Sequence, residues 1–307
     1  MHARGMFYLT GPTKSFSLRL LLLVCLLFAA EAAHADTIYV ATDMGSDGEI
    51  LKIDSSGHTS VFASGLSSPT GLAFDSIGNL YVANLGNNTI DKFTADGTES
   101  VFASYALNSP IGLAFDATGN LYVASEGNSL IVRFDSGGNP SLFSSREPEP
   151  AGLAFDRNGT LYVANWGNSI DKLDTNGNKS TFASGLSLPV GLAFDSTGNL
   201  VVANLGNDTL VRFDTNGVGS VITSVGPRRF SGPCAVAFDE SNDLFVLNNG
   251  DGTLDEFESN GNVGVIAYGL GTPTAIAIQI PEPSTWIMVV LGSSVLLACR
   301  RFDHKSS

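Results

Sequence analysis

Short runs of apolar or alternating residues, separated by turn residues, recur along this chain from about residue 36 to residue 280. In the stretch that begins at Gly191 the runs are GLAF, NLVVAN, TLVRF and SVITS, and the segments between them are DSTG, LGND and DTNG. Val, Phe, Tyr, Ile and Leu favour strands, whereas Gly, Asn, Asp and Ser favour turns. Each unit therefore predicts four antiparallel strands joined by hairpins, and no convincing helical period interrupts them.

The unit repeats at a nearly constant spacing. The sequence GLAFD or a degenerate copy of it begins at Gly71, Gly112, Gly152, Gly191, Ala235 and Ala275, so consecutive copies are 41, 40, 39, 44 and 40 residues apart. A period near 40 residues with several short strands in each unit is typical of a β-propeller blade.

The incomplete units at the two ends decide the number of blades. The first unit, from Thr37 to Gly65, lacks the first strand, whereas the last unit, from Thr274 to Ile280, has only the first strand. Five complete units lie between them. We therefore predict an all-β, six-bladed propeller over residues 36–280, closed by pairing of the C-terminal first strand with the N-terminal three strands, which removes open sheet edges at the seam.

Residues 1–35 predict a secretory signal peptide. Basic residues precede the apolar run LLLLVCLLFAA, and Ala33-His34-Ala35 has the small-x-small pattern of a cleavage site, which makes Asp36 the expected first mature residue. The alternative, an uncleaved anchor, is disfavoured because the apolar run is short. Cys234 is then the one cysteine of the predicted ring, so a disulfide within the ring is excluded, and we interpret it as a small buried hydrophobic residue.

The charge of the chain argues against one class of partner. Between Asp36 and Cys299, 10 Lys and Arg residues stand against 28 Asp and Glu residues, a net charge of −18. Such a surface repels phosphate backbones, so we do not expect nucleic acid as a partner. Many of the carboxylates belong to predicted turns, and no spaced Asp loop with a closing Glu is present. We expect neither a bound metal nor a cofactor.

Residues 281–307 form a separate tail. Pro281-Glu282-Pro283 is followed by an apolar run and then by Arg300-Arg301. As a helix, Trp286 to Cys299 would span about 21 Å, less than the roughly 30 Å of a hydrocarbon core. The basic end nevertheless suits a stop-transfer segment with its positive end in the cytoplasm. We therefore predict a short transmembrane helix with a basic tail.

This tail resembles the PEP-CTERM sorting signal of Gram-negative bacteria that make exopolysaccharide. The residues that carry the resemblance are Pro281, Glu282, Pro283, Arg300 and Arg301, together with the short apolar span between them. The resemblance implies recognition by an exosortase-type processing enzyme, transient anchoring in the inner membrane, removal of the tail, and delivery to the cell envelope or extracellular matrix.

The repeat resembles NHL-type propellers and, more loosely, the gluconolactonase or senescence-marker-protein family and virginiamycin B lyase. The lactonase resemblance implies Asn or Asp metal ligands directly before the Gly-Leu-Ala of certain first strands. The residues at these positions are neither carboxylates nor amides: Thr70, Ile111, Ala151, Val190, Cys234 and Thr274. The lyase resemblance implies a histidine base near one mouth of the ring, but His58, the one histidine of the ring, falls in a turn predicted on the opposite face.

The candidate binding residues follow the second strands of the blades. Four asparagines end these strands and precede a glycine by two residues, namely Asn84, Asn165, Asn204 and Asn248. They are interpreted as tight-turn residues, with a ring of amides around a polar mouth as the alternative. Glu126 and Trp166 follow the equivalent strand ends, where two other blades have Leu. A carboxylate beside an exposed indole can hold a sugar ring. The alternative is that Glu126 and Trp166 reflect sequence variation in the loops without a function.

The sequence therefore predicts a secreted, surface- or matrix-sorted, non-enzymatic propeller that binds polysaccharide or protein through one face. The alternative is a lactonase- or lyase-like enzyme with relocated catalytic residues, for which Glu126 and Asp43 are the candidates. The longer connection before Ala235 adds Arg228 and Arg229, interpreted as solvated loop charges or as contacts to an anionic polysaccharide.

Overall fold

The computed structural model describes residues 36–43, 47–222, 224–225 and 228–279, which belong to one compact unit. The predicted signal peptide and the predicted sorting tail lie outside the described residues. Within those ranges no helix has the length and apolar character that crossing a membrane requires.

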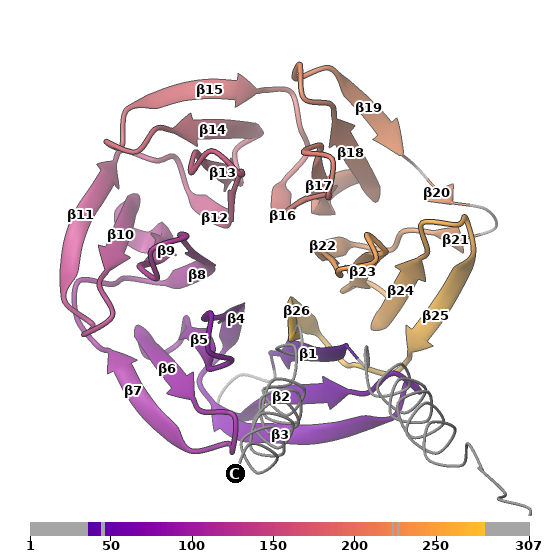
Figure 1. The fold of residues 1–307 in the computed structure, drawn as a ribbon, viewed down its shortest axis with the longest axis horizontal. Helices are drawn as coiled ribbons and strands as arrows, with labels where there is room; N and C mark the ends of the chain where they lie inside the picture. Colours follow the sequence, from indigo (N-terminus) through magenta and orange to yellow (C-terminus); the bar gives the residue numbers. More distant parts are fainter. Residues whose placement is uncertain (1–35, 44–46, 223, 226–227, 280–307) are drawn as a thin grey trace, which may run out of the picture. The chain divides into compact units, whose positions relative to one another are not determined.

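Six four-stranded antiparallel sheets form a closed ring, which confirms the predicted propeller (Figure 1). Blade 1 contains β26 (Pro273–Gln279), β1 (Thr37–Thr42), β2 (Gly48–Ile53) and β3 (Thr59–Leu66). Blade 2 contains β4 (Pro69–Phe74), β5 (Leu80–Asn84), β6 (Thr89–Phe93) and β7 (Glu99–Ala103). Blade 3 contains β8 (Pro110–Phe115), β9 (Leu121–Ser125), β10 (Leu130–Phe134) and β11 (Pro140–Ser145).

The other three blades have the same order of strands. Blade 4 contains β12 (Pro150–Phe155), β13 (Leu161–Asn165), β14 (Ser169–Leu173) and β15 (Lys179–Ala183). Blade 5 contains β16 (Pro189–Phe194), β17 (Leu200–Asn204), β18 (Thr209–Phe213) and β19 (Gly219–Ile222). Blade 6 contains β22 (Pro233–Phe238), β23 (Leu244–Asn248), β24 (Thr253–Phe257) and β25 (Val263–Ala267).

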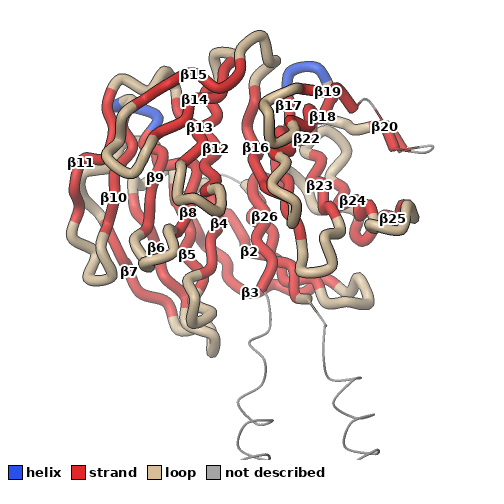
Figure 2. Tube along the Cα trace, turned by 45° about the horizontal axis from the view of Figure 1, so that its top comes forward, coloured by secondary structure: helices blue, strands red, loops and turns tan. Residues whose placement is uncertain are grey.

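The few elements outside the blades are short. A hairpin of β20 (Ser224–Val225) and β21 (Arg228–Arg229) lies in the connection from blade 5 to blade 6. Two 3-10 turns, η2 (Glu126–Asn128) and η3 (Leu205–Asn207), follow second strands, and Figure 2 shows them in blue among the red strands.

Blade 1 is built from both ends of the ring, as predicted. β26 pairs antiparallel with β1, from Thr37 opposite Gln279 to Thr42 opposite Pro273. β1 then pairs with β2 on its other side. Because the seam lies inside a sheet rather than between two sheets, the ladder of hydrogen bonds holds the ring closed.

The first strands lie close together around the central axis. A Cβ atom added to Gly112 would lie 2.0 Å from the Ala151 carbonyl oxygen, and one added to Gly152 would lie 1.8 Å from the Val190 carbonyl oxygen. Glycine is required here because the backbones of neighbouring blades approach each other directly. The channel that the first strands leave between them has a volume of about 150 Å³.

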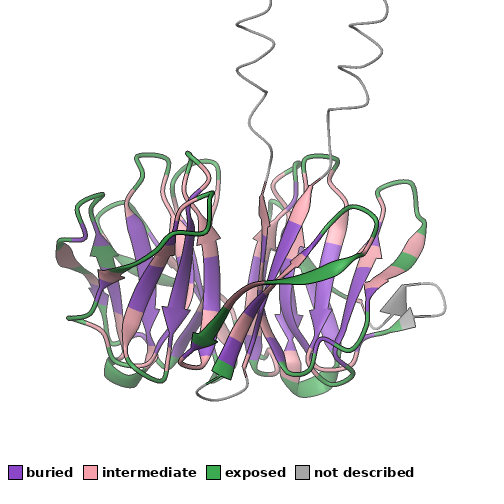
Figure 3. Cartoon of the chain, turned by 90° about the horizontal axis from the view of Figure 1, so that it is seen from below, coloured by how far each residue is buried: buried purple, intermediate pink, exposed green. Residues whose placement is uncertain are grey.

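Aromatic side chains pack the blades against one another. In blade 1 the Tyr39 ring meets the Phe62 and Phe74 rings edge-on, with centroids 5.1 and 5.2 Å apart. The equivalent tyrosines of blades 2, 3 and 4 make the same pairs of contacts. Edge-to-face geometry is the favoured arrangement of aromatic pairs. In Figure 3 buried residues lie along the inner strands of the blades, and exposed residues lie in the loops and on the outer strands.

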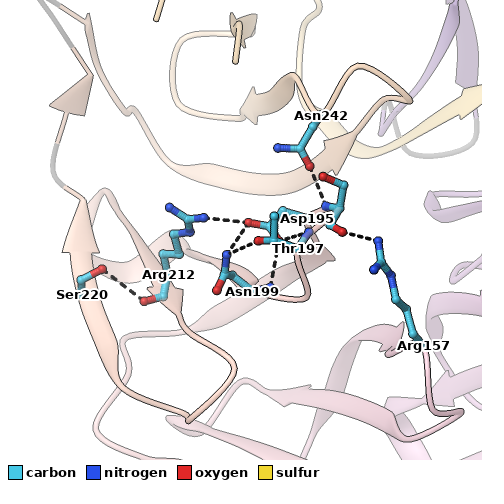
Figure 4. Close-up of polar contacts among 8 residues, drawn as sticks. Arg157, Asp195, Thr197, Asn199, Arg212, Ser220 and Asn242 are labelled. Carbon is cyan, nitrogen blue, oxygen red and sulfur yellow. Dashed lines mark hydrogen bonds and ion pairs between the residues drawn. The ribbon is translucent and has the colours of Figure 1, made fainter. Parts of the chain in front are cut away.

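The ring has two faces of different construction. The turn face carries the loops that join first to second and third to fourth strands. Its aspartates cap their own turns, and Asp195 is the most heavily bonded (Figure 4). Burial raises the pKa of Asp195, but hydrogen bonds from Asn199, Thr197 and Arg212 outweigh this effect and hold the pKa well below its usual range. The opposite face, here called the mouth face, carries the loops from second to third strands and the connections between blades.

Candidate functional site

The four candidate asparagines lie beneath the mouth face. All four side chains are buried, with exposed fractions of 0 to 2%: Asn84, Asn165, Asn204 and Asn248. Each side-chain amide donates to a hydroxyl at the start of the third strand, at 3.2 Å in every case. The amides therefore hold the loops above them in position, and a ligand on the surface would meet the loops first.

Buried carboxylates accompany these amides in alternate blades. Asn165 Nδ2 donates to Asp171 Oδ2 at 2.9 Å, and the same pair recurs as Asn84 with Asp91 and as Asn248 with Asp255. Blades 1, 3 and 5 have Leu51, Val132 and Val211 at the aspartate position, as the strand registers show. This alternation was not among the sequence-based predictions, although an alignment of the third strands of the blades displays it.

The carboxylates buried in the blades and those in the turns should have opposite effects on how stability depends on pH. Burial raises the pKa of Asp91 and Glu147, so the stability that depends on their protonated forms is lost as the pH rises through the raised pKa values. Side-chain hydrogen bonds from Asn139 and Asn178 are the largest causes of the lowered pKa values of Asp135 and Asp174, whose stabilisation is lost as the pH falls.

We therefore expect the melting temperature to be highest at mildly acidic pH, near about 5, and to fall toward pH 8 and below about pH 3.5. Melting curves across this range provide the measurement. The Asp91→Asn variant, which has no charge to desolvate, should lose less stability between pH 5 and 8 than the parent chain. A melting temperature that rises steadily from pH 5 to 8 would contradict the assignment.

Trp166 and Leu188 bring apolar surface to the mouth face. Trp166 is 36% exposed and follows β13, where its backbone N–H donates to the Glu149 carbonyl oxygen at 3.1 Å. Leu188 is 46% exposed and directly precedes the first strand of the next blade. Its φ of 46° lies in the left-handed region, as does that of the residue before the first-strand proline in blades 2, 3, 4 and 6, so this backbone conformation belongs to the connection. What distinguishes Leu188 is its exposed apolar side chain, and an exposed leucine and an exposed indole in consecutive blades are typical of a binding surface.

Sequence reasoning singled out Trp166 but missed Leu188. The available signal was the residue before the proline of each first strand, which is Ser68, Ser109, Glu149, Leu188, Gly232 or Thr272. Leu188 is the apolar member of that set. Glu126, the other predicted contact, lies half-buried in η2 of blade 3, and its N–H donates to the Ser109 carbonyl oxygen at 3.1 Å.

The six positions at which the lactonase resemblance implies metal ligands line the central channel, and the two threonines among them bond to neighbouring blades. Thr70 Oγ1 donates to the Pro110 carbonyl oxygen at 2.9 Å, and Thr274 Oγ1 donates to the Pro69 carbonyl oxygen at 2.7 Å. Cys234 is buried, and burial raises the pKa of its thiol to about 12, so it stays protonated. In the described part of the chain, no group of three or more His, Cys, Asp and Glu residues is placed to hold a metal ion.

The residues considered for relocated catalysis are not brought together as neighbours. Asp43 follows β1 of blade 1, whereas Glu126 follows β9 of blade 3, with blade 2 between them. His58 lies on the turn face, and its Nδ1 atom is 3.9 Å from Asp54 Oδ2. His58 therefore lies on the opposite face from Asp43 and Glu126.

The fold and these loops define the class of protein as a six-bladed β-propeller. The chain is similar to a structure in a nidogen/laminin complex, with a TM-score of 0.69 and 18% identity over 80% of this chain and 98% of the other. It is also similar to virginiamycin B lyase from Staphylococcus aureus, with a TM-score of 0.58 and 16% identity over 74% of this chain and 83% of the lyase.

A third similar structure is a protein of unknown function from Bacteroides caccae, with a TM-score of 0.65 and 15% identity over 80% of this chain and 99% of that one. No family model and no curated protein matches the sequence. At these identities the similarity shows the shared fold, and function has to be argued from the site.

Proposed function

We propose that the ring is a secreted, non-enzymatic binding module that takes a polysaccharide or a protein on its mouth face. The observation that carries the proposal is the exposed indole of Trp166, with the exposed Leu188 preceding the next blade. Aromatic side chains with an accessible face supply large contact areas in binding sites. Propellers similar to this one include one from a nidogen/laminin complex, which supports a protein-binding role for the architecture.

The enzymatic alternative is a lyase-like or lactonase-like activity with relocated groups. The structures of two lyases support it at the level of the fold. The positions of His58, Asp43 and Glu126 favour binding over catalysis, because general acid–base catalysis requires groups that converge on one substrate.

We further propose that the tail directs the ring to the cell envelope or extracellular matrix through an exosortase-type enzyme. The support is the order of Pro281-Glu282-Pro283, a short apolar span and Arg300-Arg301. In a host with an exosortase, mass spectrometry of the exported protein should show that residues from Trp286 onward are absent. A mature protein that retains Trp286 to Ser307 would count against sorting.

Binding is tested with the purified protein on a glycan array and against secreted proteins of the host. Trp166→Ala should weaken binding at least about 10-fold, because the stacking surface is removed, and Glu126→Ala should weaken it less. Ile77→Ala provides the control, since Ile77 is 76% exposed on the turn face between β4 and β5. Binding that depends on Ile77 and not on Trp166 would place the ligand on the wrong face for this proposal.

A further inference from the structure

In four blades, two backbone hydrogen bonds fasten each loop of the mouth face to the connection that enters the same blade. The inner bond runs from the first loop residue to the residue before the proline, as from Leu85 N–H to the Ser68 carbonyl oxygen at 3.0 Å. The outer bond runs from the loop glycine to the preceding connection residue. These outer bonds join Gly86 to Ser67, Gly127 to Asn108, Gly206 to Ser187 and Gly250 to Ser231, at 2.9 to 3.1 Å.

Blade 4 keeps the inner bond but lacks the outer one. Trp166 N–H donates to the Glu149 carbonyl oxygen, whereas the hydrogen bonds among the described residues include none from Gly167 N–H to the Pro148 carbonyl oxygen. The loop itself is also one residue shorter, since three residues separate Asn165 from Ser169, against four between the paired strand ends of blades 2 and 5. Asn168, the last residue of this loop, has a φ of 151°, against 60° for Asn88 and 56° for Asp208, which end the longer loops.

The shorter loop, without this bond, leaves Gly167 uncrowded at the mouth face, and this place beside Pro148 is here called the notch. A Cβ atom added to Gly167 would meet no atom within 4 Å. At the equivalent glycines of blades 2, 5 and 6, an added Cβ would lie 2.5 or 2.6 Å from a serine hydroxyl of the connection. Blade 4 has Pro148 in place of that serine, and both Pro148 and Gly167 are exposed. The notch thus presents a backbone N–H donor and a carbonyl acceptor that the other blades use internally.

The surroundings of the notch combine apolar and polar groups. The exposed Trp166 indole is adjacent to Gly167 in the chain, and the exposed Glu149 follows Pro148. Beneath the loop lies the fully buried Asn165, whose Oδ1 atom, like those of Asn84 and Asn204 in blades 2 and 5, has no hydrogen-bond partner among the described residues.

We propose that this notch is the ligand subsite of the mouth face and that it binds a neutral pyranose ring of a polysaccharide. This inference rests on the proposed binding function and specifies its ligand. The C–H face of the sugar stacks on Trp166, while its hydroxyls accept from Gly167 N–H and donate to the Pro148 carbonyl and the Glu149 carboxylate. The net charge of −18 between Asp36 and Cys299 disfavours uronates, sulfated sugars and phosphorylated glycans.

Two substitutions close the notch without disturbing the core. Gly167→Leu fills it, and the backbone of Gly167 does not need a positive φ. Pro148→Ser introduces the serine that blades 2, 5 and 6 carry at this position, where its hydroxyl lies against the loop glycine. Gly264→Leu is the matched control, because Gly264 lies in the outer strand β25 and an added Cβ there also meets no atom within 4 Å.

The test measures the binding of the full chain to neutral glucan and mannan hexasaccharides and to a galacturonate hexasaccharide. With Trp286→Phe in the background, Trp166 is the remaining tryptophan, so its fluorescence reports the site directly. Neutral hexasaccharides should bind and shift this fluorescence. Gly167→Leu and Pro148→Ser should each lower the affinity at least about 10-fold with an unchanged melting temperature, whereas Gly264→Leu should bind like the parent.

The outcomes separate the two proposals. Neutral binding that survives both notch-closing substitutions overturns the notch and leaves the binding function standing. Preference for the galacturonate, or binding of a secreted protein but of no neutral sugar, overturns the ligand assignment alone. A chain that binds neither sugars nor secreted proteins overturns the proposed function together with this inference.

Discussion

Ending the chain at Thr272, which removes β26, is expected to abolish folding of the ring. β26 is the first strand of blade 1 and pairs with β1 along its whole length. It also contributes Ala275 and Ala277 to the core between blades 1 and 2. Net stabilities of about 5–15 kcal/mol cannot absorb the loss of a complete inner strand, whose hydrogen bonds alone contribute about 1 kcal/mol each. Circular dichroism and limited proteolysis provide the measurement.

A circular permutation, which moves β26 from the end of the ring sequence to its beginning, is the control for this truncation. Gln279 pairs with Thr37, so a short turn can join Pro273–Gln279 to the front of residue 36 as a hairpin. The rearranged chain should regain a cooperative melt. If the truncated chain melts cooperatively at the parent temperature, closure through β26 does not hold the ring together.

The Gly152→Ala substitution should cause the largest loss of stability among single changes. The added Cβ would lie 1.8 Å from the Val190 carbonyl oxygen, which is backbone and cannot rotate away. Relief requires a shift of β12 away from β16, and such overpacking typically costs roughly 3 kcal/mol. For a domain of this size we expect a melting temperature lower by roughly 6 to 12 °C.

Gly264→Ala is the control for this prediction, because it adds the same methyl group to β25 where nothing lies within 4 Å. Its melting temperature should stay within about 2 °C of the parent. Blades 6 and 1 already carry Ala235 and Ala275 at the position of Gly152. If Gly152→Ala melts at the parent temperature, the prediction is wrong. The first strands of blades 4 and 5 would then accommodate an alanine, as the first strands of blades 6 and 1 already do at Ala235 and Ala275.

Most of the architecture followed from local patterns. The alternation of apolar and polar residues, and turns such as DSTG between GLAF and NLVVAN, specify hairpins without reference to distant residues. Counting the incomplete units then decided the closure, and the pairing of β26 with β1 confirmed it. The asparagines were ambiguous, because an Asn before a turn glycine fits an exposed amide and a buried one equally well. Their burial depends on which loop covers them.

The sequence by itself determined six blades, the position of the seam and the acidic character of the ring, because repetition and composition are properties of the chain alone. Only the tertiary structure decided that blade 4 has an open notch. Pro148 and Gly167 belong to different segments, and their relationship exists only where the connection entering blade 4 lies against the loop after β13. The sequence displays the shorter loop after Asn165, but it does not display a missing hydrogen bond between distant residues, which becomes visible when the packed blades are compared with one another.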